Sequence, residues 1–220
     1  MRNINRLSLH RLNEYAENLS GSRIDHRSYV PGEIIYSAET YAKGLFFLEK
    51  GSILVKTTAP DGSDDVIRIL GQDSFFGLLP LIRRTRYTST AVALQQETRV
   101  TFIPRPIVGE ALKDYQFVIG FLKILSERIH DNEIHLLHIK NKNAEERLAY
   151  ILIELSNVFQ TKVNDPAPMI TIRKKELASY IGVTPETLSR RLADFEKQGW
   201  IELHLKGIRV VQIESLQNMA

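Results

Sequence analysis

The 220-residue sequence predicts an α+β protein, and three features along the chain support this fold class. Short β-rich runs separated by turn residues fill residues 28–103 and indicate a β-sandwich or barrel. A heptad pattern over residues 112–141 predicts one long helix. Residues 142–220 carry a helix-turn-helix pattern followed by a hairpin. We therefore expect three parts, with residues 1–111 forming the first.

The first part opens with an amphipathic segment and continues with the short runs. The apolar positions of the segment, which predict a helix, are Leu7, Leu9, Leu12, Tyr15, Ala16 and Leu19. We expect this helix to pack on the β-domain; the alternative is a membrane or protein contact through its arginines. The β-rich runs are IIY, LFFLE, SILVKTT, VIRIL, SFFGLL, TSTAVAL and RVTFI. Pro60-Asp61-Gly62 predicts a hairpin turn, because Pro fixes φ and Gly accepts positive φ.

Composition excludes several chemistries. Cysteine is absent, so disulfides, Cys-ligated zinc, a thiolate nucleophile and a Cys-bound iron–sulfur cluster are impossible. The net charge is only +3, from 29 basic and 26 acidic residues, so nucleic-acid binding would depend on where a few basic residues lie. The chain has no continuous apolar leader and no apolar run of about 18 residues, so we expect a cytoplasmic protein without a membrane span.

The predicted long helix carries an apolar seam with one polar position. The seam residues alternate at spacings of four and three: Val118, Leu122, Leu125, Ile129, Asn132, Leu136 and Ile139. Such a seam predicts a parallel homodimer, in which the single Asn would set the register. The alternative is that the helix only packs on its own β-domain.

A helix-turn-helix is predicted over residues 174–198. Gly182 ends the first helix in the tight turn, Thr184 can cap the second, and Pro185 suits its first position. The second helix would bury Leu188, Leu192 and Phe195 and turn outward Glu186, Thr187, Ser189, Arg190 and Arg191. This is how a reading helix presents its early residues to the major groove of double-stranded DNA.

The chemistry of these side chains suggests their roles. Arg190 can pair with guanine O6 and N7, and Glu186 can accept from cytosine N4. The run WIELHLKGIRVVQI predicts a hairpin beside this motif. The candidate DNA contacts are Arg173, Lys174, Lys175, Thr184, Glu186, Thr187, Ser189, Arg190 and Lys206.

This arrangement resembles the CRP/FNR family of bacterial transcription regulators. The resemblance rests on the blocks KGLFFLEKG, SFFGLLPL and ETLSRRLADFEKQGWI. It implies a jelly-roll β-roll like a cyclic-nucleotide-binding domain, a dimerisation helix and a C-terminal winged helix-turn-helix. It also implies a homodimer on a palindromic site that recruits RNA polymerase, as an activator, or blocks it. The reading helix is of the FNR type, which implies a TTGAT- or TTGAC-like half-site.

The region where the family binds its effector departs from the cyclic-AMP pattern. Where that pattern has Glu and Arg, this chain has Leu78 and Thr88, although Ser89 is retained. Losing both charged partners argues against a cyclic nucleotide, unless Arg83, Arg84 or Arg86 substitutes. The family's oxygen sensing needs a cysteine-bound cluster, which this chain cannot hold. We expect no cofactor, and no haem, because His130, His135 and His138 are interpreted as solvated helix residues.

A small-molecule effector of another kind remains open. The region resembles the NtcA nitrogen-control branch, whose effector is 2-oxoglutarate. The candidate pocket residues are Phe76, Gly77, Leu78, Leu79, Arg86, Tyr87, Ser89, Arg128 and Glu133. The alternative is a regulator with no effector, because bulky apolar side chains fill the pocket. A cupin-like enzyme is not expected, since only His26 lies near the roll and no metal-ligand set is present.

Overall fold

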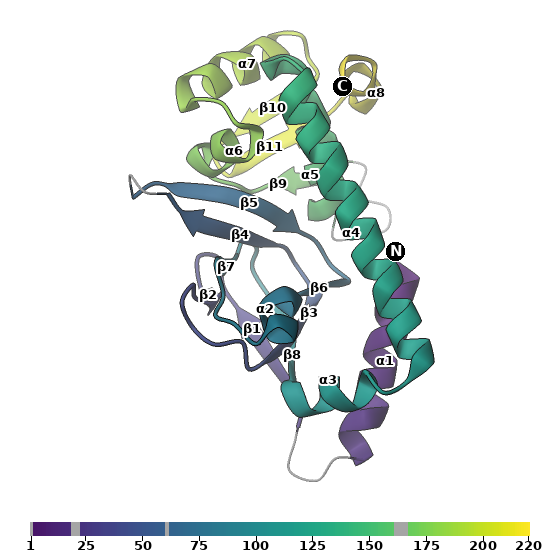
Figure 1. Cartoon of the computed structure of the whole chain (residues 1–220). Coiled ribbons are helices and arrows are strands. Elements are labelled where there is room, and N and C mark those ends of the chain that lie inside the picture. The colour runs from purple at the N-terminus through teal and green to yellow at the C-terminus, as the bar shows by residue number, and fades with distance from the viewer. Residues whose placement is uncertain (1, 19–22, 60–61, 161–166) are drawn as a thin grey trace. The chain divides into compact units, whose positions relative to one another are not determined.

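The computed structural model describes residues 2–18, 23–59, 62–160 and 167–220 (Figure 1). Two compact units divide the chain: Met1–Gly51 with Gln72–Glu133, and Ser52–Gly71 with Ile134–Ala220. The predicted turn at Pro60 and Asp61, and Leu19 of the N-terminal segment, lie outside the described residues. So do the side chains of residues 2–8, including Leu7.

The first unit contains an antiparallel sheet in the order β1-β8-β3-β6. Its strands are β1 (Asp25–Tyr29), β3 (Gly44–Lys50), β6 (Ser74–Phe76) and β8 (Thr98–Pro104). A further ladder pairs β2 (Ile34–Tyr36) with β7 (Thr90–Ala93). These strands cover the predicted runs IIY, LFFLE, TSTAVAL and RVTFI and the start of SFFGLL. Leu45 and Phe47 of β3 lie on one face of the sheet and belong to the core cluster, which fixes the register of this strand. Strand β1 has no apolar run and was not predicted.

The run SFFGLL is only partly β-structure. Strand β6 ends at Phe76, Gly77 takes φ 78°, and α2 (Leu78–Arg83) follows. The prediction of one β-rich run was therefore wrong in its second half. The left-handed Gly77 stops the strand, and the next residues bury Leu78 and Leu81 in the core from one face of a helix.

The predicted N-terminal helix is present as α1 (Arg2–Asn18) and packs on the core of the first unit through Leu12. Arg11 donates to Asp114 over 2.5 Å, and the Tyr15 hydroxyl donates to the same carboxylate over 2.9 Å. The Tyr15 hydrogen bond, with backbone N–H donors and Arg11, lowers the pKa of Asp114. This residue lies directly before the long helix, so α1 is tied to the start of that helix.

The long helix α4 (Tyr115–Asn141) begins at Tyr115, after α3 (Arg105–Ala111) and a short turn. Phe117, Phe121 and Ile124 bury one side of its first half in the first unit, with the two Phe rings stacked at 5.3 Å. That packing fixes which face of α4 is turned toward its own domain. In the described part of the chain, no helix has the length and apolar character needed to cross a membrane.

The described part of the second unit contains the end of α4, four further helices and the sheet β10-β11-β9. The further helices are α5 (Ala144–Phe159), α6 (Lys174–Ile181), α7 (Pro185–Lys197) and α8 (Ile213–Met219), and the strands of the sheet are β9 (Met169–Ile170), β10 (Ile201–His204) and β11 (Gly207–Val210). Helix α5 begins at a capping box, in which Asn143 accepts from the backbone of Glu146 and the Glu146 carboxylate accepts in return.

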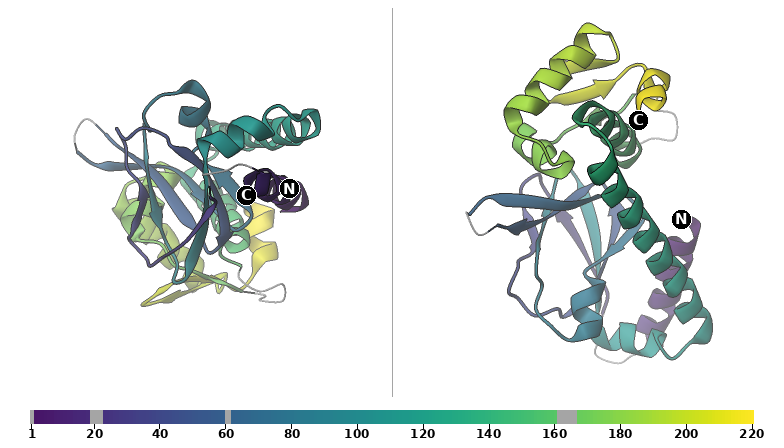
Figure 2. Two further views of the ribbon diagram at one scale, coloured as in Figure 1. Left: turned by 90° about the horizontal axis from the view of Figure 1, so that it is seen from below. Right: turned by 45° about the horizontal axis from the view of Figure 1, so that its top comes forward.

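The hairpin of β4 (Ile53–Thr58) and β5 (Asp64–Leu70) belongs to this second unit. The predicted division placed it with residues 1–111. Within this unit β5 lies against α6, and the Val66 amide donates to the Ser179 hydroxyl over 2.9 Å. In the right-hand view of Figure 2 the blue β4–β5 hairpin lies below the green helix α6.

Candidate nucleic-acid interface

The turn between α6 and α7 has the geometry that the sequence predicts. Gly182 adopts φ 74°, and its amide donates to the carbonyls of Ala178 and Ser179. The Thr184 hydroxyl accepts from the Thr187 amide over 3.2 Å, and Pro185 opens α7. The C-terminus of α6 and the N-terminus of α7 are therefore both capped by residues of the turn between them.

Helix α7 has one buried side and one polar side. Leu188, Leu192 and Phe195 are buried, whereas the side chains that remain exposed at its N-terminal end are Glu186, Ser189 and Arg190. Thr187 is half-buried, and its hydroxyl accepts from that of Thr184. The exposed set can donate and accept hydrogen bonds at base edges, which is the chemistry of major-groove readout.

Arg191 does not belong to the exposed set. Its guanidinium contacts Glu145 at the first turn of α5 and lies 3.4 Å from Asp194. The prediction that it points outward was wrong, because a carboxylate from another helix holds it. Its role is to tie α7 to α5.

The remaining predicted DNA contacts lie at the edges of this motif. Arg173, Lys174 and Lys175 are exposed around the start of α6, and Arg173 lies 3.4 Å from the Glu176 carboxylate. Strands β10 and β11 form the predicted hairpin, with Lys206 exposed at its tip. The Leu203 amide of β10 donates to Glu196 of α7 over 3.0 Å, which fixes the hairpin to the end of the reading helix.

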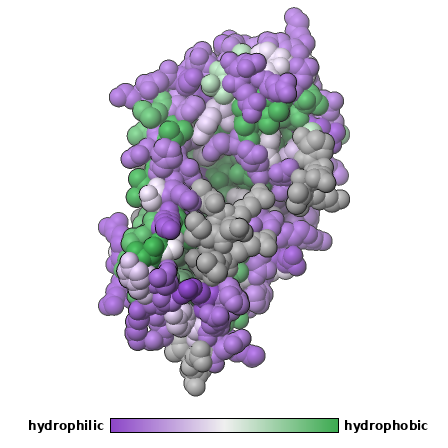
Figure 3. Space-filling model, turned by 90° about the vertical axis from the view of Figure 1, so that its right-hand side faces the viewer, coloured by the Kyte–Doolittle hydropathy of each residue, from purple (hydrophilic) through white to green (hydrophobic). Residues whose placement is uncertain are grey.

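The predicted dimer seam is mostly uncovered. Val118 and Leu125 are half-buried. The seam residues that α4 leaves exposed are Leu122, Ile129, Asn132, Leu136 and Ile139. Apart from Asn132, these exposed residues form an apolar stripe along α4, and such a stripe on a long helix fits a partner helix. Figure 3 shows hydrophobic patches among hydrophilic side chains on one face of the molecule.

Aromatic side chains fill the interior of the predicted effector region. The ring of Tyr87 stacks on that of Tyr36 at 4.0 Å, and Phe46 stacks on Phe76 at 5.1 Å. Tyr36 also lies 5.7 Å from Phe46, so the four rings form one cluster. Burial raises the pKa of Tyr87, and the nearby Tyr36 adds to the shift.

Other predicted pocket residues face elsewhere. Leu78 lies in the core and Leu79 is exposed, so these neighbours do not share a pocket wall. The guanidinium of Arg86 lies over the ring of Tyr41 at 5.0 Å and 3.8 Å from Glu39. Ser89 and Arg128 are half-buried and Glu133 is exposed. Arg86 thus has neighbours that the sequence did not indicate.

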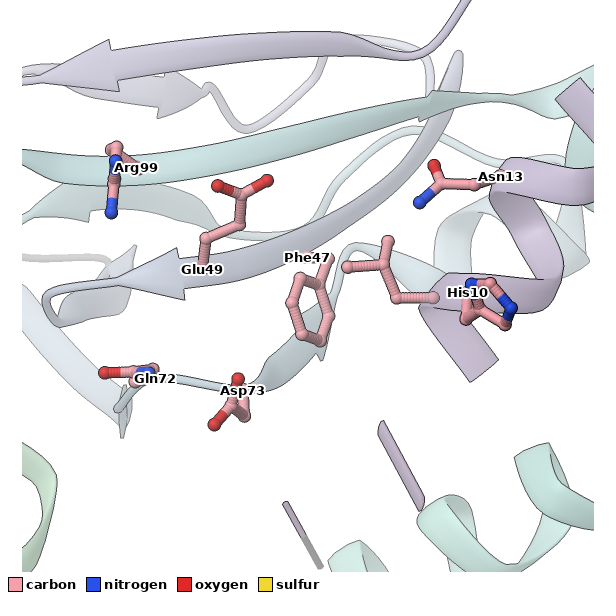
Figure 4. Close-up of a pocket in the computed structure, with 8 residues that line it drawn as sticks. His10, Asn13, Phe47, Glu49, Gln72, Asp73 and Arg99 are labelled. Carbon is pink, nitrogen blue, oxygen red and sulfur yellow. The ribbon is translucent and has the colours of Figure 1, made fainter. Parts of the chain in front are cut away.

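A polar groove that the sequence did not predict lies between α1 and the sheet of the first unit (Figure 4). Its volume is about 450 Å³. It is lined by Leu9, His10, Asn13, Phe47, Glu49, Gln72, Asp73 and Arg99. Within the described residues, no group of three or more His, Asp or Glu side chains is placed to hold a metal ion.

Comparison with known proteins matches two families to separate parts of the chain. Residues 26–115 match the family model described as cyclic nucleotide-binding domain, and residues 146–219 match the Crp-like helix-turn-helix domain. The chain is 25% identical over 192 residues to a CRP-like cAMP-activated global transcriptional regulator of Mycobacterium tuberculosis, covering 86% of this chain and 85% of the relative. It is 26% identical over 195 residues to the fumarate and nitrate reduction regulatory protein of Escherichia coli, covering 86% and 76%.

Solved structures share the fold. FixK2 from Bradyrhizobium japonicum superposes with a TM-score of 0.78 at 22% identity, over 90% of this chain and 97% of that one. A CRP/FNR-family regulator from Thermus thermophilus superposes with a TM-score of 0.72 at 17% identity, covering 89% and 98%. The predicted combination of β-domain, long helix and C-terminal helix-turn-helix is confirmed.

Proposed function

Because the chain belongs to the CRP/FNR family of DNA-binding transcription regulators and is not an enzyme, we propose that it binds a palindromic site as a homodimer. The reading helix α7 of each copy would enter one major groove. The observation that carries this proposal is the exposed set of Glu186, Ser189 and Arg190 above a fully buried apolar side.

The roles of the contacts follow from their positions. Arg190 would pair with a guanine and Glu186 with the amino group of a cytosine, which suits a TTGA-type half-site. Lys174 and Lys175, at the start of α6, would contact backbone phosphate, as would Lys206 at the tip of the hairpin. The bound dimer would then recruit RNA polymerase as an activator or block it, and run-off transcription from a TTGA-type promoter gives the sign.

The homodimer is supported by the uncovered seam. Phe117, Phe121 and Ile124 bury the other side of the first half of α4. The apolar seam residues that remain exposed and would meet a second copy are Leu122, Ile129, Leu136 and Ile139. A dimer through this seam would place two reading helices by two-fold symmetry, and a palindromic site has the same symmetry.

We further propose that the β-domain takes no cyclic nucleotide in the family's usual pocket. The ring cluster of Tyr36, Phe46, Phe76 and Tyr87 occupies the interior, and the usual Glu position is a buried leucine. A diacid such as 2-oxoglutarate would need Arg86, which Tyr41 and Glu39 already engage. A regulator whose roll is filled by its own side chains accounts best for these contacts.

Gel-shift titration tests the DNA proposal with two variants of α7. Arg190→Ala removes a base contact and is expected to weaken binding to a TTGAT inverted repeat by about 5- to 150-fold, or about 1–3 kcal/mol. Lys197→Ala removes the same charge from the other end of α7 and is expected to bind nearly as the parent does. Equal loss in both variants, or no binding to any TTGA-type palindrome, would contradict the proposal.

A further inference from the structure

Two histidines of α4 lie against the helices of the DNA-binding domain, and all the residues concerned belong to the second compact unit. The ring of His135 stacks on that of Tyr180 in α6, with centroids 4.8 Å apart and planes within 20°. The ring of His138 stacks on that of Tyr150 in α5 at 3.8 Å and 17°. We call these two ring stacks, together with Arg147, the α4 junction. The histidines are therefore not the solvated residues that the sequence predicted.

Arg147 connects the same elements through backbone carbonyls. Its guanidinium donates to the carbonyls of Ile139 and Lys142 over 3.0 and 3.2 Å. It also donates over 3.4 Å to the carbonyl of Gly182, the turn residue of the helix-turn-helix. The end of α4, the start of α5 and the reading motif thus meet at one cation.

The imidazoles are placed to be neutral. The Nδ1 atoms of both rings are buried and have no hydrogen-bond partner. The cavity between the rings is about 10 Å³, at the lower limit for a single water molecule. Protonation at Nδ1 would therefore place an N–H where no protein acceptor lies and at most one water molecule fits, which is costly.

The charged neighbours add to this cost. The histidines face Arg147 and Tyr150 of α5 and Tyr180 of α6. Lys142 lies just after the end of α4. The residues that line the cavity include no carboxylate. Burial lowers the pKa of His135, with His138 as the second cause. Burial also lowers the pKa of His138, with Lys142 as the second cause. Stacking on Tyr would favour a cation, but burial dominates here.

We propose that His135 and His138 are positioning residues that hold the helix-turn-helix against the end of α4 only as neutral imidazoles, so that mild acid releases the junction and weakens DNA binding. The inference rests on the proposed DNA-binding function. The direction of the pH effect follows from linkage. A histidine whose pKa is lowered in the docked state stabilises that state fully when the pH is above the ordinary histidine pKa, near 6.5, and stabilises it less as the pH falls. Each unit of lowering is worth about tenfold in the docking equilibrium.

The test compares pH profiles of DNA binding between about pH 7.5 and 5.5. The double variant His135→Phe/His138→Phe keeps both ring stacks and cannot take up a proton. We expect the parent to lose about tenfold or more in affinity over this range, whereas the double variant changes much less. His130→Phe, at an exposed position of the same helix, should keep the parent's profile. Equal profiles for the parent and the double variant would overturn the proposal.

A second measurement needs neither DNA nor a variant. Proton NMR titration of the full chain should show His135 and His138 with pKa values below the ordinary histidine value. If neither pKa is lowered, the junction is not proton-sensitive and the proposal fails. If the chain binds no TTGA-type DNA yet shows the two depressed titrations, the function proposed above fails and the junction stands.

Discussion

Truncating Ile129 should weaken the dimer and leave the folded monomer intact. The side chain is 60% exposed on the seam face of α4. Full burial of an isoleucine is worth about 1.5–3 kcal/mol, so covering the exposed part is worth about 1–2 kcal/mol in each copy. Ile129→Ala removes all but the Cβ atom from both copies. It should cost about 2–3 kcal/mol, or about 30- to 150-fold in the dimer Kd.

Sedimentation equilibrium measures the change in the dimer Kd, and two further variants of α4 serve as controls. His130→Ala, one residue along on the outward side, should leave the dimer Kd unchanged. Phe121, on the opposite side of α4, is only 5% exposed, so Phe121→Ala should instead destabilise the first unit by about 3–5 kcal/mol. A dimer of Ile129→Ala that is as tight as the parent's would refute the assignment of the seam.

Three further predictions concern the cap, the α1 contact and the roll. Thr184→Ala removes the cap of α7 and should lower the free energy of unfolding, measured in urea, by about 1 kcal/mol. The hydrogen bond from Tyr15 lowers the pKa of Asp114, so the ionised carboxylate stabilises the fold at any pH above the ordinary Asp pKa. This stabilisation is lost as the pH falls through the lowered pKa of the folded state. The melting temperature of the parent should therefore fall more steeply below pH 4 than that of Asp114→Asn. Millimolar cyclic AMP should leave the melting temperature unchanged, and a clear rise would show that the ring cluster opens.

The reading motif could be predicted from the sequence because its signals are local. Gly182, Thr184 and Pro185 specify the turn and the first helical position through their own backbone preferences. The hairpin after Gly199 was found in the same way. The apolar seam could be predicted from residue spacing alone, because residues three and four apart lie on the same face of one helix.

The contacts that were missed join residues far apart in the chain. The stack of His135 on Tyr180 and the pairing of Arg191 with Glu145 depend on how four helices pack, which no local pattern specifies. The environment of Arg86 depends on Tyr41, which lies across a β-bridge from it. The apolar composition of residues 74–79 predicted one β-rich run, but the run continues through a glycine into a helix.

A homodimer that reads a palindrome has a defined stoichiometry and symmetry on DNA. Titration of the full chain against a TTGAT inverted repeat, a direct repeat of the same half-site and a single half-site should distinguish a two-fold dimer from other modes of binding. The account predicts two chains on the inverted repeat, bound more tightly than on either other site. Equal affinity for the three sites, or one chain on the inverted repeat, would contradict it.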